Sequence, residues 1–241
     1  MSSNLVAFIL GAGSHIGAAL AAHLRKNGYR VALGSRNPKP DTSEDEGYFH
    51  VKVDVESRVS IESAFEAVVS KLGPVNAVIY NGELPPDSSA SVAFPEDEAD
   101  FLSLSSEEVY KAALLGAGTF AAAQQALKSF RNDVHREHPK AFIVTGNLLP
   151  FDQFSPSKFF TLGAQKALQT RFVATASKSY EAENIKFYFA TLVGKDGGLP
   201  GPDFPASAET HAKVYWELIN NKQTNWDHRF TLDGKTFLPS V

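Results

Sequence analysis

Short apolar runs alternate with longer amphipathic stretches along almost the whole chain. The runs at 5–10, 29–35, 49–55, 75–82, 141–147, 185–194 and 229–234 are predicted to be strands. The stretches at 16–27, 60–73, 107–130, 158–183 and 207–221 have helical periodicity. Strict alternation of the two kinds predicts an α/β fold, with a parallel sheet covered by helices on both faces. Because no linker or repeat divides residues 1–241, we expect one domain.

Composition narrows the classes of partner. The chain has 241 residues, 43% of them hydrophobic, which is enough for a sizeable core. Its net charge of −4 argues against binding to nucleic acid or to an anionic membrane. The apolar run near the start is too short for a signal peptide or a membrane span. The sequence has no cysteine, which excludes disulfides and thiolate metal sites and suits a reducing compartment. We therefore expect a cytoplasmic protein.

One acidic region interrupts the regular pattern. Between 83 and 110 the chain has no lysine or arginine but has eight carboxylates, namely Glu83, Asp87, Glu96, Asp97, Glu98, Asp100, Glu107 and Glu108. Such a region could meet a basic partner, but a solvated loop beside a site is the favoured interpretation. The histidines lack the paired spacing of a metal site, so no metal is expected.

A glycine-rich turn joins the first predicted strand to the first predicted helix, in "ILGAGSHIGAAL". Glycines allow a tight turn and close backbone approach, so a pyrophosphate can lie against free N–H groups at the start of the helix. This position makes the motif a strong indicator of a dinucleotide site. The residues expected to bind the cofactor here are Gly11, Gly13, Ser14, His15, Ile16 and Gly17.

With the alternating elements, this turn resembles the short-chain dehydrogenase/reductase family over almost the whole chain, whose loop reads TGxxxGxG. The resemblance implies a Rossmann-type, doubly wound parallel sheet. Gly11 and Gly17 match the first and last glycines of the motif, but His15 occupies the place of the middle one. The His15 side chain could donate to a phosphate oxygen or point to solvent, and the sequence does not favour either alternative.

The segment after the second predicted strand bears on the choice of cofactor. "LGSRNP" offers Ser35 and Arg36, with no carboxylate before Asp41. An NAD enzyme would use an acid here to hold the ribose 2′-hydroxyl, whereas an arginine favours a 2′-phosphate. The sequence therefore favours NADP(H), and the alternative is a solvent-facing arginine.

Three further segments match the family's motifs. Asp54 and Val55 stand where the family holds the adenine ring. "IYNGE" resembles the NNAG segment through Asn81 and Gly82, although Glu83 replaces its final glycine. "FTLDGKTF" resembles the VDGG strand through Asp233 and Gly234.

The family's reaction implies a tyrosine, a lysine, a serine and an asparagine. Two lysines are candidates, because "FSPSKFF" resembles the motif around Lys158 and "TLGAQK" contains Lys166. Lys166 lies nineteen residues before Ile185, the spacing typical of the family, whereas Lys158 lies twenty-seven before it. The spacing favours Lys166, and Leu162 then occupies the position of the tyrosine.

The other two positions are also substituted. Asn147 stands for the serine and Leu115 for the asparagine, so Lys166 and Asn147 are the expected catalytic residues. A leucine cannot donate a proton, and general acid catalysis is worth about 10²–10⁴-fold in rate. The segments "GAGSHIG", "YNGE", "TGN" and "LGAQK" also resemble a group of fungal short-chain reductases that lack the tyrosine. The "GLPGPDFP" segment lies where the family has its substrate lid, and its glycines are either hinges or ordinary loop residues.

Two functions remain open on the sequence alone. The preferred one is an NADP(H)-dependent reductase of a carbonyl or imine on a small molecule, with an atypical acid. The other is a redox-silent descendant that binds NADP(H) as a sensor or carries out non-redox chemistry. The predicted helix at 107–130 is apolar nearly all round, so a second subunit is expected to cover one face, giving a homodimer or homotetramer.

Overall fold

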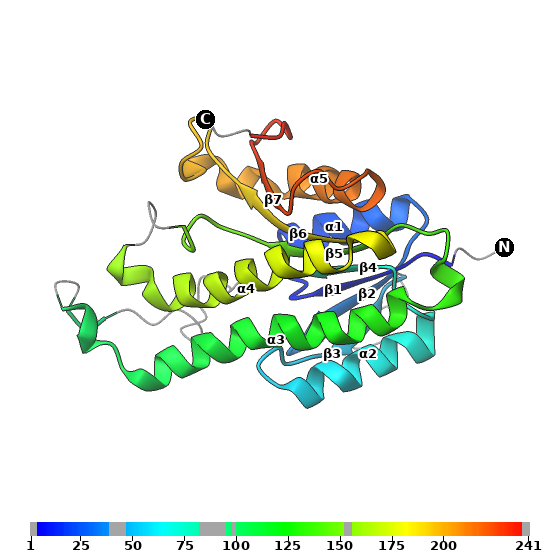
Figure 1. Ribbon diagram of the computed structural model, residues 1–241, viewed down its shortest axis with the longest axis horizontal. Coiled ribbons are helices and arrows are strands. Elements are labelled where there is room, and N and C mark those ends of the chain that lie inside the picture. The colour runs from blue at the N-terminus through cyan, green and yellow to red at the C-terminus, as the bar shows by residue number, and fades with distance from the viewer. Residues whose placement is uncertain (1–3, 39–46, 82–94, 98–99, 152–155, 238–241) are drawn as a thin grey trace.

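In the computed structural model of the protein, the described residues are 4–38, 47–81, 95–97, 100–151 and 156–237. They contain one seven-stranded parallel sheet in the order β3-β2-β1-β4-β5-β6-β7 (Figure 1). Its strands are β1 (Val6–Leu10), β2 (Arg30–Ser35), β3 (Phe49–Lys52), β4 (Ala77–Tyr80), β5 (Lys140–Thr145), β6 (Ile185–Leu192) and β7 (Asp227–Phe230). The prediction of a doubly wound, Rossmann-type α/β fold is confirmed.

Two layers of helices cover the sheet (Figure 1). One face carries α1 (Ile16–Lys26) and α5 (Ala208–Asn220), and the other carries α2 (Arg58–Leu72), α3 (Ser106–Phe130) and α4 (Phe160–Ser179). Each layer has its own apolar core, because side chains of a strand point alternately to the two faces. On β1, Val6, Phe8 and Leu10 face one core, whereas Ala7 and Ile9 face the other.

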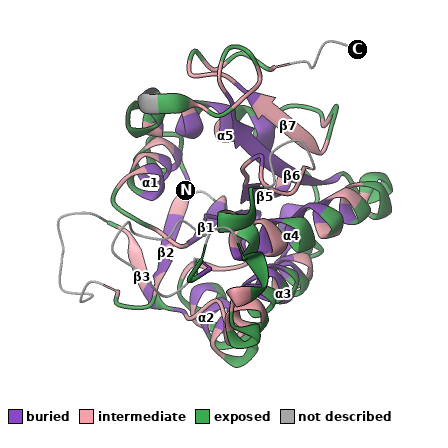
Figure 2. Ribbon diagram, turned by 90° about the vertical axis from the view of Figure 1, so that its left-hand side faces the viewer, coloured by how far each residue is buried: buried purple, intermediate pink, exposed green. Residues whose placement is uncertain are grey.

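Burial along the strands follows their position in the sheet. Every residue of β1, β4 and β6 is buried, which explains the continuous apolar sequences of β1 and β4. The edge strands β3 and β7 are mostly half-buried, and Figure 2 shows them at the two sides of a buried centre. The order of strands reverses between β1 and β4, and in such sheets the crevice outside their carboxyl ends is the usual ligand site.

Several predicted ends differ from the structure. The strand predicted at 229–234 stops at Phe230, because the chain turns between Thr231 and Lys235 with Gly234 at φ +81°. In that turn the Asp233 carboxylate accepts from the Thr231 hydroxyl and pairs with Lys235. The helix predicted at 158–183 begins only at Phe160, after a 3-10 turn, and ends at Ser179. Gly82 lies outside the described residues, as do Glu83, Asp87 and Glu98 of the acidic region.

An apolar patch lies exposed on the outer side of α3 and α4. It consists of Tyr110, Leu114, Phe120, Phe160 and Leu168, which are between 38% and 67% exposed. Ala113 and Ala117 of α3 are also exposed, whereas Ala112 and Leu115 are buried. The predicted all-round apolar character of this helix is therefore real, and one side of it is uncovered. Among the described helices, none is long and apolar enough to cross a membrane.

Candidate functional site

The glycine turn after β1 is tightly closed by its own backbone. Gly11 has a φ of +79°, and the N–H groups of Gly11 and Ala12 both donate to the carbonyl of Gly34, at 3.0 and 3.1 Å. A Cβ atom on Gly17 would lie 2.8 Å from the Ala12 Cα, so only glycine lets the helix begin this close to the turn. A Cβ on Gly13 would meet nothing within 4 Å, which leaves open space on the outer side of the turn.

The start of α1 faces the same side. The helix begins at Ile16, and the side chain of His15 before it does not cap the helix. The N–H of Ala18 donates to the carbonyl of Gly13 at 3.1 Å, and Ser14 in the same turn is exposed. The His15 ring lies elsewhere, because its Nε2 donates to the carbonyl of Pro205 at 2.7 Å. Its ring centroid is also 5.8 Å from that of Phe204. His15 thus contacts the 3-10 segment Gly201–Ala206, which contains most of the predicted lid.

The adenine side of the predicted site lies at the carboxyl ends of β2 and β3. Ser35 is the last residue of β2, and the side chain of Arg36 after it is exposed. The Asp54 carboxylate accepts from the Glu56 N–H at 3.1 Å and so shapes the turn before α2. Next to it, the carbonyl of Val55 lies directly against α3. A Cβ atom on Gly118 would fall 2.0 Å from that oxygen, so only a residue without a side chain lets the backbone of α3 approach Val55 this closely.

Asn81 supports the glycine turn from below. Its side chain is fully buried, its Nδ2 donates to the carbonyl of Gly11 at 3.0 Å, and its Oδ1 accepts from the Thr145 hydroxyl at 2.8 Å. Both polar ends of the amide are therefore bonded inside the protein. Asn81, which is predicted to bind the cofactor, thus also holds Gly11, the residue on which the turn begins.

Lys166 lies on α4 with 5% of its surface exposed, and its Nζ donates to the carbonyl of Thr145 at 2.8 Å. This bond brings the lysine to the carboxyl end of β5. Lys158, the rejected candidate, is exposed in the 3-10 turn before α4 and lies over the ring of Phe159. The structure therefore supports the spacing argument that selects Lys166.

The three substituted positions lie around this lysine in different ways. Asn147 follows β5 by two residues, and its Oδ1 accepts from the N–H of Leu149 at 3.0 Å, so its –NH2 group is the part suited to face a substrate. Leu162 is half-buried one helical turn before Lys166. The side chain of Leu115 is buried, and its carbonyl accepts from the hydroxyl of Tyr80 at 3.3 Å. Burial raises the pKa of Tyr80, which keeps that phenol neutral.

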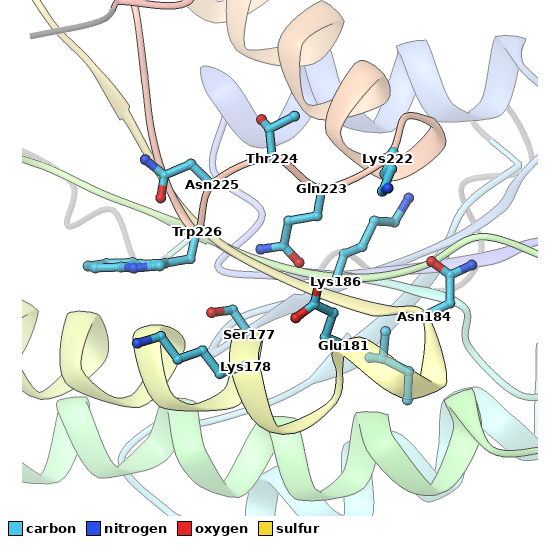
Figure 3. Close-up of a pocket in the computed structure, with 11 residues that line it drawn as sticks. Ser177, Lys178, Glu181, Asn184, Lys186, Lys222, Gln223, Thr224, Asn225 and Trp226 are labelled. Carbon is cyan, nitrogen blue, oxygen red and sulfur yellow. The ribbon is translucent and has the colours of Figure 1, made fainter.

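A cavity of about 320 Å³ lies at the opposite edge of the sheet, between the end of α4 and the chain that joins α5 to β7 (Figure 3). Lys186 lines it, and burial lowers the pKa of its amine to about 8. That amine donates to the carbonyls of Ile219 and Asn221 at the end of α5. Gln223 likewise bonds both backbone groups of Phe187. These polar groups serve the fold, and the cavity shares no residue with the predicted site.

Sequence reasoning missed Thr145 and the role of Gly118. Thr145 ends an apolar strand and looks like an ordinary strand residue, so nothing in its neighbourhood marks it. Gly118 lies in the middle of a helix, where glycine is unfavourable, and that is a signal of close approach that the sequence did contain. Within the described part of the chain, no group of three or more His, Cys, Asp or Glu side chains could hold a metal ion.

Comparison with known proteins places these features in context. A family model described as short chain dehydrogenase matches residues 5–145. The Short chain dehydrogenase/reductase dmxR12 of Cryptosporiopsis sp. (strain 8999) is 32% identical over 235 residues, covering 95% of this chain and 92% of that protein.

Solved structures share the fold at low identity. The 3-ketoacyl-(acyl-carrier-protein) reductase from Brucella melitensis, complexed with NADH, has a TM-score of 0.72 at 16% identity, covering 97% of this chain and 98% of that one. A metagenomic short-chain oxidoreductase in complex with NADP has a TM-score of 0.71 at 13% identity, with 95% and 97% covered. At such identities the likeness shows the fold alone.

Proposed function

The chain belongs to the short-chain dehydrogenase/reductase family, and from this premise we propose that it is an NADP(H)-dependent oxidoreductase that reduces a carbonyl or imine of a small molecule. The observation that carries the proposal is the position of Lys166. Its ammonium is held at the carboxyl end of β5 by Thr145, whose hydroxyl is joined through Asn81 to the glycine turn. One edge of the sheet thus has a bonded connection from a phosphate-binding turn to the family's lysine.

The residues on this edge fit a nicotinamide dinucleotide. The open space beside Gly13 and the leading N–H groups of α1 suit a pyrophosphate, because backbone donors and the helix dipole both favour an anion there. The exposed guanidinium of Arg36 suits a 2′-phosphate, which supports NADP(H) over NAD(H). Lys166 would contact the nicotinamide ribose, as the family resemblance implies.

Bound NADPH would supply a hydride to the carbon of the substrate's C=O or C=N group. The heteroatom then takes up a proton, and Leu162 has none to give. Asn147 lies two residues beyond Thr145, which binds the lysine, and could donate from its –NH2 group to hold and polarise the substrate. The proton then comes from water or from the Lys166 ammonium. The predicted result is a slow reductase, since orientation and preorganised dipoles remain while the placed acid is missing.

The second candidate function is a redox-silent protein that binds NADP(H) as a sensor or uses the pocket for non-redox chemistry. The observation that favours it is the joint substitution of the groups that would touch the substrate, at Leu162, Asn147 and Leu115. The glycine turn, Arg36 and Lys166, which would touch the nucleotide, are retained, although His15 replaces the middle glycine of the motif. This pattern fits nucleotide binding without turnover.

Turnover separates the two candidates. Wild type is mixed with NADPH and a panel of aldehydes, ketones and imines, and loss of NADPH absorbance is followed. Consumption with at least one substrate class, reduced strongly by Lys166→Ala, is the expected result. NADPH binding without consumption anywhere would overturn the reductase and leave the redox-silent candidate. In that case Leu162→Tyr with Asn147→Ser should awaken slow reduction, because the new phenol would lie one turn from Lys166.

Cofactor preference is tested separately at Arg36. Wild type should bind NADPH more tightly than NADH in a fluorescence titration. Arg36→Ala should reduce the difference between the two binding free energies by about 1–3 kcal/mol, the scale of a charge-assisted hydrogen bond. Equal affinity of wild type for both nucleotides would overturn the preference.

We also propose that residues 1–241 form one domain, that the protein is cytoplasmic, and that it is a homodimer or homotetramer through the apolar patch.

A further inference from the structure

A chain of buried polar groups runs beneath the candidate site. The hydroxyl of Tyr215, on α5, donates to the Thr145 Oγ1 at 3.0 Å. The Thr145 hydroxyl donates to the Asn81 Oδ1 at 2.8 Å, and the Asn81 Nδ2 donates to the carbonyl of Gly11 at 3.0 Å. Tyr215 and Asn81 have no measurable exposure and Thr145 has 7%. In a buried environment each of these groups needs its partner, because an unpaired polar atom there is costly.

The direction of every bond in the chain follows from its last acceptor. A backbone carbonyl can only accept, so Asn81 must turn its –NH2 group toward Gly11 and its oxygen toward Thr145. That oxygen can only accept, so the Thr145 hydroxyl must donate to it. The same hydroxyl then offers a lone pair, which Tyr215 fills with its own proton. The chain is therefore fully oriented, and Tyr215 is its terminal donor.

The register of the sheet explains why these groups meet. Leu10 of β1 lies beside Tyr80 of β4, which lies beside Val144 of β5. Gly11, Asn81 and Thr145 are the residues that follow them, so they end three neighbouring strands at one level. This level is the carboxyl edge, at the place where the strand order reverses.

Thr145 also holds the lysine. Its carbonyl accepts from the Lys166 Nζ, while its hydroxyl takes part in the chain to Gly11. A shift of Thr145 would consequently move the support of both the glycine turn and Lys166. The two parts of the nucleotide site come from elements on opposite faces of the sheet, and this single residue joins them.

We infer that Thr145 and Tyr215 are positioning residues for the nucleotide site, which they shape through Asn81, Gly11 and Lys166 without contacting the nucleotide. The inference rests on the proposed binding of NADP(H) at this edge. It assigns a role to α5, a helix that offers the site no side chain of its own at the glycine turn.

The test compares conservative variants by NADPH fluorescence titration. Thr145→Val keeps the shape but removes the hydroxyl, so it strands the Asn81 oxygen and the Tyr215 proton together, and NADPH should bind about tenfold more weakly or worse. Thr145→Ser keeps the hydroxyl and should bind within about twofold of wild type. Tyr215→Phe removes only the terminal donor, and about two- to fivefold weaker binding is expected.

The matched control lies at the amino edge of the same strands. Tyr29 is a buried tyrosine whose hydroxyl accepts from Asn76, and Asn76 in turn accepts from the N–H of Val6 on β1. Tyr29→Phe therefore removes a buried phenol hydroxyl linked to a buried asparagine, directly rather than through a threonine as at Tyr215, and it does so away from the glycine turn. It should lower the free energy of unfolding by an amount similar to Tyr215→Phe and leave NADPH affinity unchanged.

Two results would overturn the inference. If Thr145→Val and Tyr215→Phe fold and bind NADPH as tightly as Tyr29→Phe does, the chain does not position the site. If wild type binds no nicotinamide nucleotide, the proposed function fails but the positioning role is still open to test. Hydrogen exchange of backbone amides in the free protein then tests that role. The Gly11 and Ala12 amides should exchange faster in Tyr215→Phe than in Tyr29→Phe, and equal rates would refute the positioning role.

Discussion

His211 makes the stability of the protein depend on pH in a defined window. The residue is 1% exposed on α5, and its Nδ1 donates to the carbonyl of Ser207 at 2.9 Å. The rings of Phe204, Tyr215 and Phe230 surround it, with centroids 5.1 to 6.4 Å away. The pKa of His211 is lowered to about 4, mainly by this burial and to a smaller extent by the nearby His15.

The sign follows from comparing the two states. The unfolded chain takes up a proton on this imidazole near its ordinary pKa of 6.5, whereas the folded protein does so only near 4. Stability from the neutral ring is therefore fully present above pH 6.5 and is lost as the pH falls toward 4. A difference of this size corresponds to about 3 kcal/mol of unfolding free energy over that window. Burial also lowers the pKa values of His135 and His228, so wild type alone cannot isolate the effect.

The substitution His211→Leu isolates it. The variant keeps an apolar side chain among the rings, and the carbonyl of Ser207 still has the backbone N–H of residue 211 as a donor at 2.9 Å. Urea unfolding, followed by the fluorescence of the two tryptophans at one protein concentration, should be measured from pH 7 to pH 4. Between pH 6.5 and pH 4, the unfolding free energy of the variant should fall by about 3 kcal/mol less than that of wild type. His23→Gln, at a partly exposed histidine on α1, is the control and should follow wild type.

The reasoning fails if wild type and His211→Leu lose the same unfolding free energy between pH 6.5 and pH 4. It also fails if the difference develops above pH 7, because the imidazole is neutral in both states there.

Two further predictions concern packing and assembly. Gly118→Ala should prevent folding or lower the unfolding free energy by more than about 3 kcal/mol, because its Cβ would fall 2.0 Å from the carbonyl oxygen of Val55. Gly13→Ala is the control and should fold normally, since its Cβ would meet nothing within 4 Å. Circular dichroism and urea unfolding compare the two variants, and a stable Gly118→Ala would contradict the contact. Light scattering at micromolar concentration should give a dimer or tetramer mass for wild type and a smaller mass for Leu114→Glu, since a charge in the apolar patch opposes its burial; a wild-type monomer would refute the assembly.

The fold was predictable because its signals are local. The central strands are mainly apolar runs, and glycines or polar residues mark where the runs stop, so their number and order could be read along the chain. The errors occur where two local signals compete. "RFTLDG" begins as a strand and contains a turn sequence, and the turn prevails because Gly234 adopts a positive φ and the Asp233 carboxylate bonds within the turn.

The site was predictable only in part, because its remaining contacts are distant in sequence. The glycine turn and Lys166 could be identified from motif and spacing. Tyr215 bonds Thr145 across 70 residues and His15 bonds Pro205 across 190, and neither partner carries a local signal. For His15 the sequence offered a phosphate or solvent, while the structure adds a third possibility, contact with the segment Gly201–Ala206.

The residues that support the candidate nucleotide site and those proposed to touch the substrate differ in how the fold depends on them. Asn81, Thr145 and Lys166 are buried and bonded to one another or to the backbone, so replacing any of them would disturb the sheet edge itself. Leu162 and Asn147 are only half-buried at the rim. Substitutions at such positions change little burial and break few bonds, so a tyrosine could be lost there without weakening the fold or the support of the lysine. Support for the proposed nucleotide site is therefore no guarantee of a catalytic acid, and turnover has to be measured apart from binding.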